Sequence, residues 1–141
     1  MTLETEGDWS GAADGHAVAV EFSGPTLEAT LTRAVEGFAD AFADIHPSMA
    51  TERHAVELHA PTRSGLLLAV LEECLRCRRE GRFAVALSDP QVLGDVLVAG
   101  IDTVPADDPH VQPLLAPVIS WHEVTLEPGP SGTWSGRIVA R

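Results

Sequence analysis

The sequence contains no lysine, asparagine or tyrosine, and all nine of its basic residues are arginine. The missing lysine excludes a Schiff-base nucleophile and a phosphate-loop lysine, and the missing tyrosine excludes a tyrosine acid. Only 2 cysteines are present, Cys74 and Cys77. In a reducing compartment such a pair is not a disulfide framework, so we expect the fold to depend on a hydrophobic core.

Basic residues are few, since 9 of them stand against 21 acidic ones and give a net charge of −12. A surface this negative repels phosphate groups, which argues against direct binding of nucleic acid or of an anionic membrane and favours a basic protein partner. No apolar run approaches the length of a membrane span. The first residues, MTLETEGDWSGAADG, lack a signal-peptide pattern. We therefore expect a cytoplasmic protein.

A chain of 141 residues fits one domain, and we expect a flexible tail over 1–14 and a folded domain over 15–141. Alternating apolar positions predict strands, 3-4 spacing predicts helices, and Thr26 is placed to cap the first helix. The predicted strands are 16–22, 54–59, 82–87, 92–101, 118–126 and 134–139, and the predicted helices are 27–45 and 64–79. This order favours an α+β fold, with two helices packed on one face of a mostly antiparallel sheet of about six strands. Asp89-Pro90 is expected to turn between the two middle strands, and the first strand to lie beside the last ones.

Two clusters have both a structural and a functional interpretation. Cys74-x-x-Cys77 is half of a zinc or redox motif, but it falls in the last turns of a helix, where the dipole disfavours a thiolate; a structural role with Cys74 in the core and Cys77 at its edge is favoured. The arginines near the same helix end have two interpretations. The favoured one is a solvated cluster that complements the helix dipole, and the alternative is a docking patch for an acidic surface or a phosphate group. These arginines are Arg76, Arg78, Arg79 and Arg82.

Several segments, in this order, resemble the archease family. GPTLE at 24–28 is similar to the Gly-x-Thr-Leu-Glu that opens the first helix of that family. The leucine-rich second helix LLLAVLEECL, the predicted strand order and a final strand led by Trp134 also agree. Asp108-Pro109 with His110, and then ISWH ending at His122, resemble the family's Asp-Pro…His…Val-Thr-Tyr-His stretch. The likeness covers about residues 13–141.

The resemblance implies an α+β accessory protein that promotes guanylylation and multiple turnover of a GTP-dependent RNA ligase of the tRNA-splicing and RNA-repair type. It also implies a divalent-cation site formed by an aspartate of an N-terminal Asp-His-Thr-Ala-Asp-like motif and by an aspartate next to the C-terminus. Its partner would be the ligase rather than RNA itself, and it would not be an enzyme.

The sequence departs from the family pattern at the metal positions. Counting from Gly24 and from Trp134 places the second motif aspartate on Ala17 and the C-terminal aspartate on Arg141; the family's lysine falls on Pro117. Alanine offers no ligand oxygen and arginine repels a cation, so we expect no cofactor and an absent or badly weakened metal site. Calcium, magnesium or manganese would bind only if the site is rebuilt, with Asp14 and His16 as residual candidates. Arg141 is expected to pair with Asp14 or Glu21 instead.

Three functions remain open from the sequence. The first is an archease-like accessory protein that binds and modulates an RNA ligase, with activation lost or kept. The second is a degenerate paralogue that serves as a scaffold for an unrelated protein. The third, and weakest, is acid–base catalysis by His122 with Asp14 or Glu123. The candidate interaction residues are His110, His122, Asp14 and Glu21. Asp107 and Asp108 are further candidate oxygen ligands, although capping of a turn with Pro109 is the favoured role for that pair.

Overall fold

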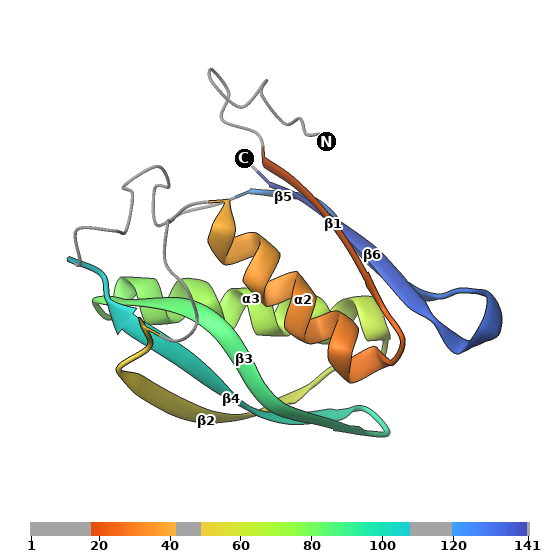
Figure 1. The fold of residues 1–141 in the computed structure, drawn as a ribbon, viewed down its shortest axis with the longest axis horizontal. Helices are drawn as coiled ribbons and strands as arrows, with labels where there is room; N and C mark the ends of the chain where they lie inside the picture. The colour runs from red at the N-terminus through yellow and green to blue at the C-terminus, as the bar shows by residue number, and fades with distance from the viewer. Residues whose placement is uncertain (1–17, 42–48, 108–119, 141) are drawn as a thin grey trace.

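A computed structural model of the chain describes residues 18–41, 49–107 and 120–140 (Figure 1). The predicted tail over 1–14 lies outside them. The elements are β1 (Val18–Gly24), α2 (Leu27–Asp40), β2 (Glu52–His59), α3 (Arg63–Arg79), β3 (Arg82–Leu93), β4 (Val96–Pro105), β5 (Trp121–Pro128), the short 3-10 helix η2 (Pro130–Gly132) and β6 (Trp134–Ala140). None of the described helices is long and apolar enough to cross a membrane.

Both helices begin at threonine caps. The side chain of Thr26 accepts a hydrogen bond from the backbone N–H of Ala29 at 3.0 Å, as predicted, and Thr62 does the same for Gly65 at 2.9 Å. These caps satisfy backbone donors that the first turn leaves unpaired. Helix α2 ends at Asp40, earlier than predicted, and residues 42–48 lie outside the described part.

The six strands form two three-stranded antiparallel sheets, in the orders β1-β6-β5 and β2-β4-β3. The predicted α+β fold and strand number are confirmed, and so is the predicted neighbourhood of the first and last strands, because Val18 pairs with Ala140. The strands divide into two sheets instead of one, and each helix contacts both: α2 packs against β1 and β3, and α3 against β5 and β3. The side chains that are fully buried include Leu31, Leu66, Leu67, Leu71, Leu97, Ile101 and Ile138.

The predicted turn at Asp89-Pro90 is wrong. Strand β3 continues through these residues to Leu93, and the chain reverses at Gly94, which has a φ of 62°. Asp89 has a φ of 48°, and the pairing with β4 shifts register between Ser88 and Gln91. A bulge on an edge strand accommodates proline without losing a hydrogen bond of the ladder, so the strand passes the dipeptide without reversing.

Helix side chains bind backbone groups along three sheet edges. Arg33 donates to the carbonyl oxygen of Ser23 in β1 at 2.7 Å. Glu28 accepts the N–H of Val92 in β3 at 3.3 Å, and Ser64 accepts the N–H of Leu126 in β5 at 2.9 Å. Each bond satisfies a polar group that strand pairing leaves unused, and it fastens the helices to both sheets.

Candidate functional site

One end of the β1-β6-β5 sheet brings together the start of β1, the end of β6 and the start of β5. Val18 begins β1 and pairs with Ala140 at the end of β6, and Ala140 also pairs with Trp121 at the start of β5. The candidates that precede or follow these strand ends in the sequence lie outside the described residues: Asp14, His16, Ala17, Asp108, His110 and Arg141. Of the candidate interaction residues, Glu21 and His122 are described.

The start of β5 is anchored to both helices by Trp121. Its ring centroid lies 5.7 Å from that of Phe38 in α2, and its Nε1 donates a hydrogen bond to Glu72 Oε2 in α3 at 2.6 Å. The next residue is exposed His122. The pairing with β6 passes from Trp121 opposite Ala140 to Glu123 opposite Val139, so His122 is the extra residue of a bulge. A bulge beside three strand ends leaves this imidazole open to a partner.

The outer face of this sheet consists of alternate residues that point away from the helices. Strand pairing aligns them in three rows across β1, β6 and β5: Ala19, Val139 and Glu123; Glu21, Arg137 and Thr125; Ser23, Ser135 and Glu127. The side chains flanking the centre are mostly short, and they leave an open hollow of about 570 Å³. We call these nine residues the outer face.

Arg137 lies at the centre of the outer face between two glutamates. Its Nη1 donates to Glu123 Oε1 at 2.8 Å, and its Nε lies 3.2 Å from Glu21 Oε2. The ion-pair partner that the structure gives Glu21 is therefore Arg137, and the predicted pairing with Arg141 stays untested because Arg141 is not described. Arg137 was not among the residues predicted from the sequence. The feature that could have identified it is its outward position on β6, the strand between β1 with Glu21 and β5 with Glu123.

The acid–base hypothesis for His122 gains no support from the described residues. Glu123, its proposed partner, is engaged by Arg137 at 2.8 Å. No hydrogen bond joins His122 to Glu123 or to another side chain in the described part of the chain. Asp14, the other proposed partner, lies outside that part. General acid–base work needs a partner within hydrogen-bond reach.

A metal site is also not assembled by the described residues. Within 18–41, 49–107 and 120–140, no group of three histidine, cysteine, aspartate or glutamate side chains is placed to hold an ion. The family positions on Ala17 and Arg141 and the candidates Asp14 and His16 are outside these ranges. The expected weakness of the metal site therefore stays a prediction. Titration calorimetry with calcium, magnesium and manganese checks it, and a saturable micromolar site would contradict it.

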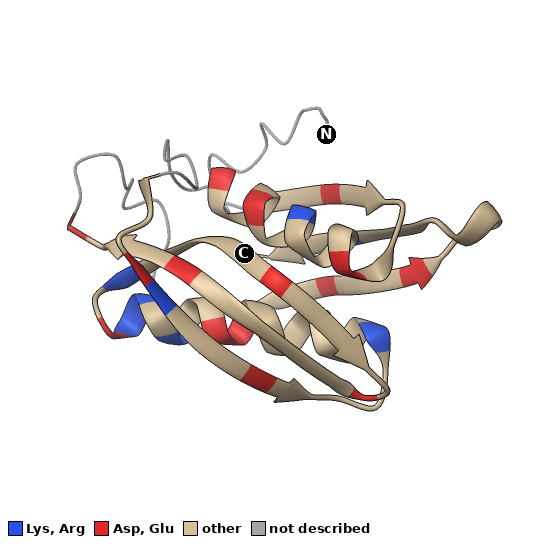
Figure 2. Cartoon of the chain, turned by 60° about the horizontal axis from the view of Figure 1, so that its bottom comes forward, with Lys and Arg blue, Asp and Glu red and all other residues tan. Residues whose placement is uncertain are grey.

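Two of the three arginines in the last turn of α3, Arg76 and Arg78, are engaged within the described part of the chain. Arg76 bonds to Glu73 at 2.6 Å and to Glu80 at 2.7 Å, and the hydrogen bond from Arg76 lowers the pKa of Glu73 below its ordinary value. The Arg78 guanidinium lies 5.7 Å from the centre of the Phe83 ring. Basic positions gather at this end of α3, where the helix dipole favours them (Figure 2).

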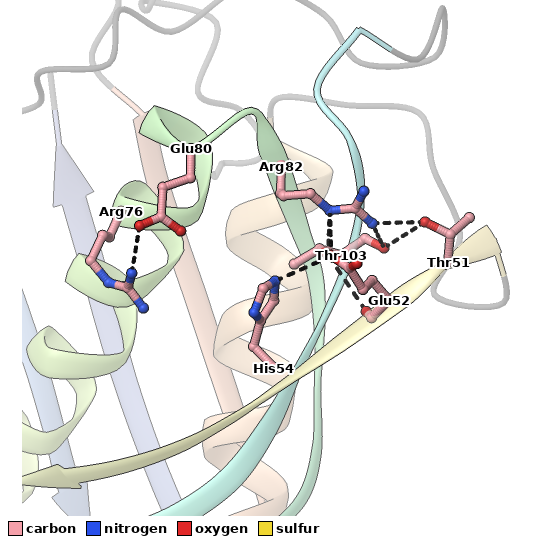
Figure 3. Close-up of polar contacts among 7 residues, drawn as sticks. All are labelled: Thr51, Glu52, His54, Arg76, Glu80, Arg82 and Thr103. Carbon is pink, nitrogen blue, oxygen red and sulfur yellow. Dashed lines mark hydrogen bonds and ion pairs between the residues drawn. The ribbon is translucent and has the colours of Figure 1, made fainter.

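Arg82 joins the beginnings of β2 and β3 to the end of β4 (Figure 3). Its Nη2 donates to Thr51 Oγ1 at 2.7 Å, and its Nε donates to Thr103 Oγ1 at 3.0 Å. Glu52 Oε1 lies 3.2 Å from the same Nε and 3.6 Å from His54 Nε2. Thr103 is fully buried, so this arginine satisfies a hydroxyl that would otherwise be costly to bury. These contacts support the structural interpretation of the arginine cluster over a docking patch.

Cys74 and Cys77 are both buried, so Cys77 lies deeper than the predicted core edge. Burial raises the pKa of both thiols, most strongly that of Cys74. Since only the thiolate is nucleophilic, we expect neither cysteine to be alkylated by iodoacetamide at pH 8 in the folded protein. Mass spectrometry measures this, with complete alkylation in urea as the control. Rapid labelling of either cysteine without urea would contradict the structural assignment.

The sequence and the fold were compared with those of known proteins. No curated protein matches the sequence. Protein 1598 of Methanobacterium thermoautotrophicum, solved in solution, is similar with a TM-score of 0.63 and 18% identity, over 87% of this chain and 90% of that one. An archease of Thermotoga maritima, described as a possible chaperone, is similar with a TM-score of 0.60 and 13% identity, over 87% of this chain and 88% of that one. At these identities the likeness shows the fold. The model of the Archease protein family (MTH1598/TM1083) matches residues 12–138, and the chain therefore belongs to the archease family.

Proposed function

We propose that this protein is a non-catalytic accessory protein that binds and modulates a GTP-dependent RNA ligase of the tRNA-splicing and RNA-repair type. The observation that carries the proposal is the family match over residues 12–138, which is accompanied by the family's fold. Family membership is consistent with an accessory role. Among the described residues, no side chain is hydrogen-bonded to His122 to support acid–base catalysis.

We further propose that the activating step is weakened or lost in this member. In the sequence, the positions of two of the family's metal-binding aspartates are occupied by Ala17 and Arg141. Divalent cations need several converging oxygen ligands, and these substitutions remove two of them and add a positive charge. Activation would survive only if Asp14 and His16, or groups of the partner, supply the missing metal ligands.

The partner is a ligase protein in the cytoplasm, with neither RNA nor a membrane bound directly. The net charge of −12 supports this, since an acidic surface is drawn to a protein whose RNA channel is basic and is repelled by phosphate.

A multiple-turnover RNA ligation assay tests the proposal, using the ligase of the same organism with and without this protein. Binding without added turnover is the expected result, because the metal positions are altered. Product beyond one equivalent of ligase, only when the protein is present, would show that activation survives and would contradict its proposed loss. A folded protein that neither binds the ligase nor changes its turnover would refute the accessory role.

The substitutions at Ala17 and Arg141 also favour a second function, that of a scaffold for an unrelated protein. A paralogue released from metal-dependent activation would keep the fold and lose these ligands. Co-purification from cells separates the two functions: recovery of the ligase with the tagged protein supports the first, and recovery of a different partner without the ligase supports the second.

A further inference from the structure

We propose that the outer face of the β1-β6-β5 sheet is the surface that docks a basic, extended segment of the partner protein, and this inference rests on the proposed function. The segment would place arginine or lysine side chains between Glu21, Glu123 and Glu127. The inner face of the same sheet is covered by α2 and α3, whereas no described element covers the outer face.

Charge defines the kind of segment that fits. The outer face has three glutamates and a single arginine, Arg137, and therefore stays negative after the internal ion pairs are formed. Glu127 is exposed and has no ion pair with another described residue, and the side chain of Glu21 is 69% exposed although it lies beside Arg137. The carboxylate oxygens of Glu127 and Glu21 can therefore still accept hydrogen bonds from an arginine or lysine of another protein.

The geometry of Arg137 adds an independent observation. Its Nε is shielded from solvent, yet it makes no hydrogen bond with any described residue, because Glu21 Oε2 at 3.2 Å is poorly aligned with it. Among the described residues, the guanidinium is therefore hydrogen-bonded to Glu123 alone, and the oxygens of Glu21 receive no hydrogen bond from it. A basic side chain of a docked segment can donate to those oxygens.

The shape of the hollow favours a polypeptide over a small molecule. Its volume of about 570 Å³ is within the range of ligand pockets, but it is open and its lining is polar, with Ser23, Thr125 and Ser135 among the glutamates. Small-molecule pockets are enclosed and mainly apolar. Short polar side chains around charged ones instead suit an extended segment that lies across the strands.

The test compares two triple variants with the same change in charge. The first is E21Q, E123Q and E127Q on the outer face, and the control is E36Q, E57Q and E80Q on α2, β2 and the end of α3. We expect the first to weaken binding of the ligase by roughly 10-fold or more and to reduce its salt dependence, with no such effect of the control. Equal affinities of the two variants would overturn the surface assignment. S135R, which fills the hollow with a positive charge, should weaken binding as well, and unchanged binding of S135R would also overturn it.

A second arm separates this inference from the proposed function. The amide resonances of the full chain are followed during titration with a hexa-arginine peptide. Shifts confined to the outer face, and reduced in the glutamine variant, support the docking surface; shifts centred elsewhere or spread evenly overturn it. If the unaltered chain does not bind the ligase, the proposed function fails and the peptide alone decides the surface. A dimer in sedimentation that S135R dissociates would assign this face to a second copy and overturn the inference.

Discussion

Replacing Ile138 with alanine is expected to lower the free energy of unfolding by about 3 kcal/mol. Ile138 is fully buried at the centre of β6, opposite Val20 on β1 and Val124 on β5. Truncation removes buried methyl groups and leaves a cavity that the strands on both sides cannot fill. For a chain of this length the melting temperature should fall by roughly 10 °C.

Urea denaturation followed by tryptophan fluorescence measures the effect of I138A. Leu93 is the matched control, because its side chain is apolar but the residue is 72% exposed at the β3–β4 hairpin. L93A should change the free energy of unfolding by about 0.5 kcal/mol or less. Equal losses in the two variants would show that β6 does not form the centre of the core.

G136A is expected to cost about 3 kcal/mol through overpacking, an effect as large as that of a core truncation. Gly136 lies on β6 between Phe22 and Leu126 of the neighbouring strands. A Cβ at this position would overlap the carbonyl oxygen of Thr125 and lie 2.7 Å from the Phe22 ring. Neither neighbour can withdraw without disturbing the strand pairing that aligns the outer face.

The control for G136A is G129A in the turn before β6. There the nearest atom to a new Cβ is the Thr133 hydroxyl, at 3.2 Å, which belongs to a side chain in an exposed turn. In thermal unfolding, G129A should lower the melting temperature by well under half of the decrease caused by G136A. If G136A melted like the unaltered protein, β1, β6 and β5 could not approach one another as closely at Gly136 as the structure places them.

The parts of the fold that depend on local signals are predictable from the sequence. Thr26 followed by Glu28 and a 3-4 apolar pattern is sufficient to locate the start of α2, because capping and amphipathicity act within a few residues. The predicted turn at Asp89-Pro90 is wrong for the opposite reason: both residues favour turns locally, but pairing with β4 on either side keeps them in one strand, which bends at a bulge instead of reversing. The division into two sheets depends on contacts between distant segments, and the order of elements alone does not determine it.

The candidate site was predictable only in part, for a similar reason. Glu21 could be identified as an outward carboxylate from alternation in β1. Its relation to Arg137 depends on the register between strands at opposite ends of the sequence, so no spacing rule detects it. The bulge that exposes His122 likewise appears only when β5 is paired with β6.

The helix side chains that bind the sheet edges have a consequence for solution behaviour. Three of the four edges, those of β1, β3 and β5, have a backbone group occupied by Arg33, Glu28 or Ser64, and the remaining edge, β2, is lined with charged residues. A strand of a second chain could pair with these edges only by displacing a helix side chain or by lying beside charged residues. Both disfavour aggregation and fibril growth. Part of this protection therefore comes from helix side chains, and a substitution at Arg33, Glu28 or Ser64 would expose a strand edge without altering any strand.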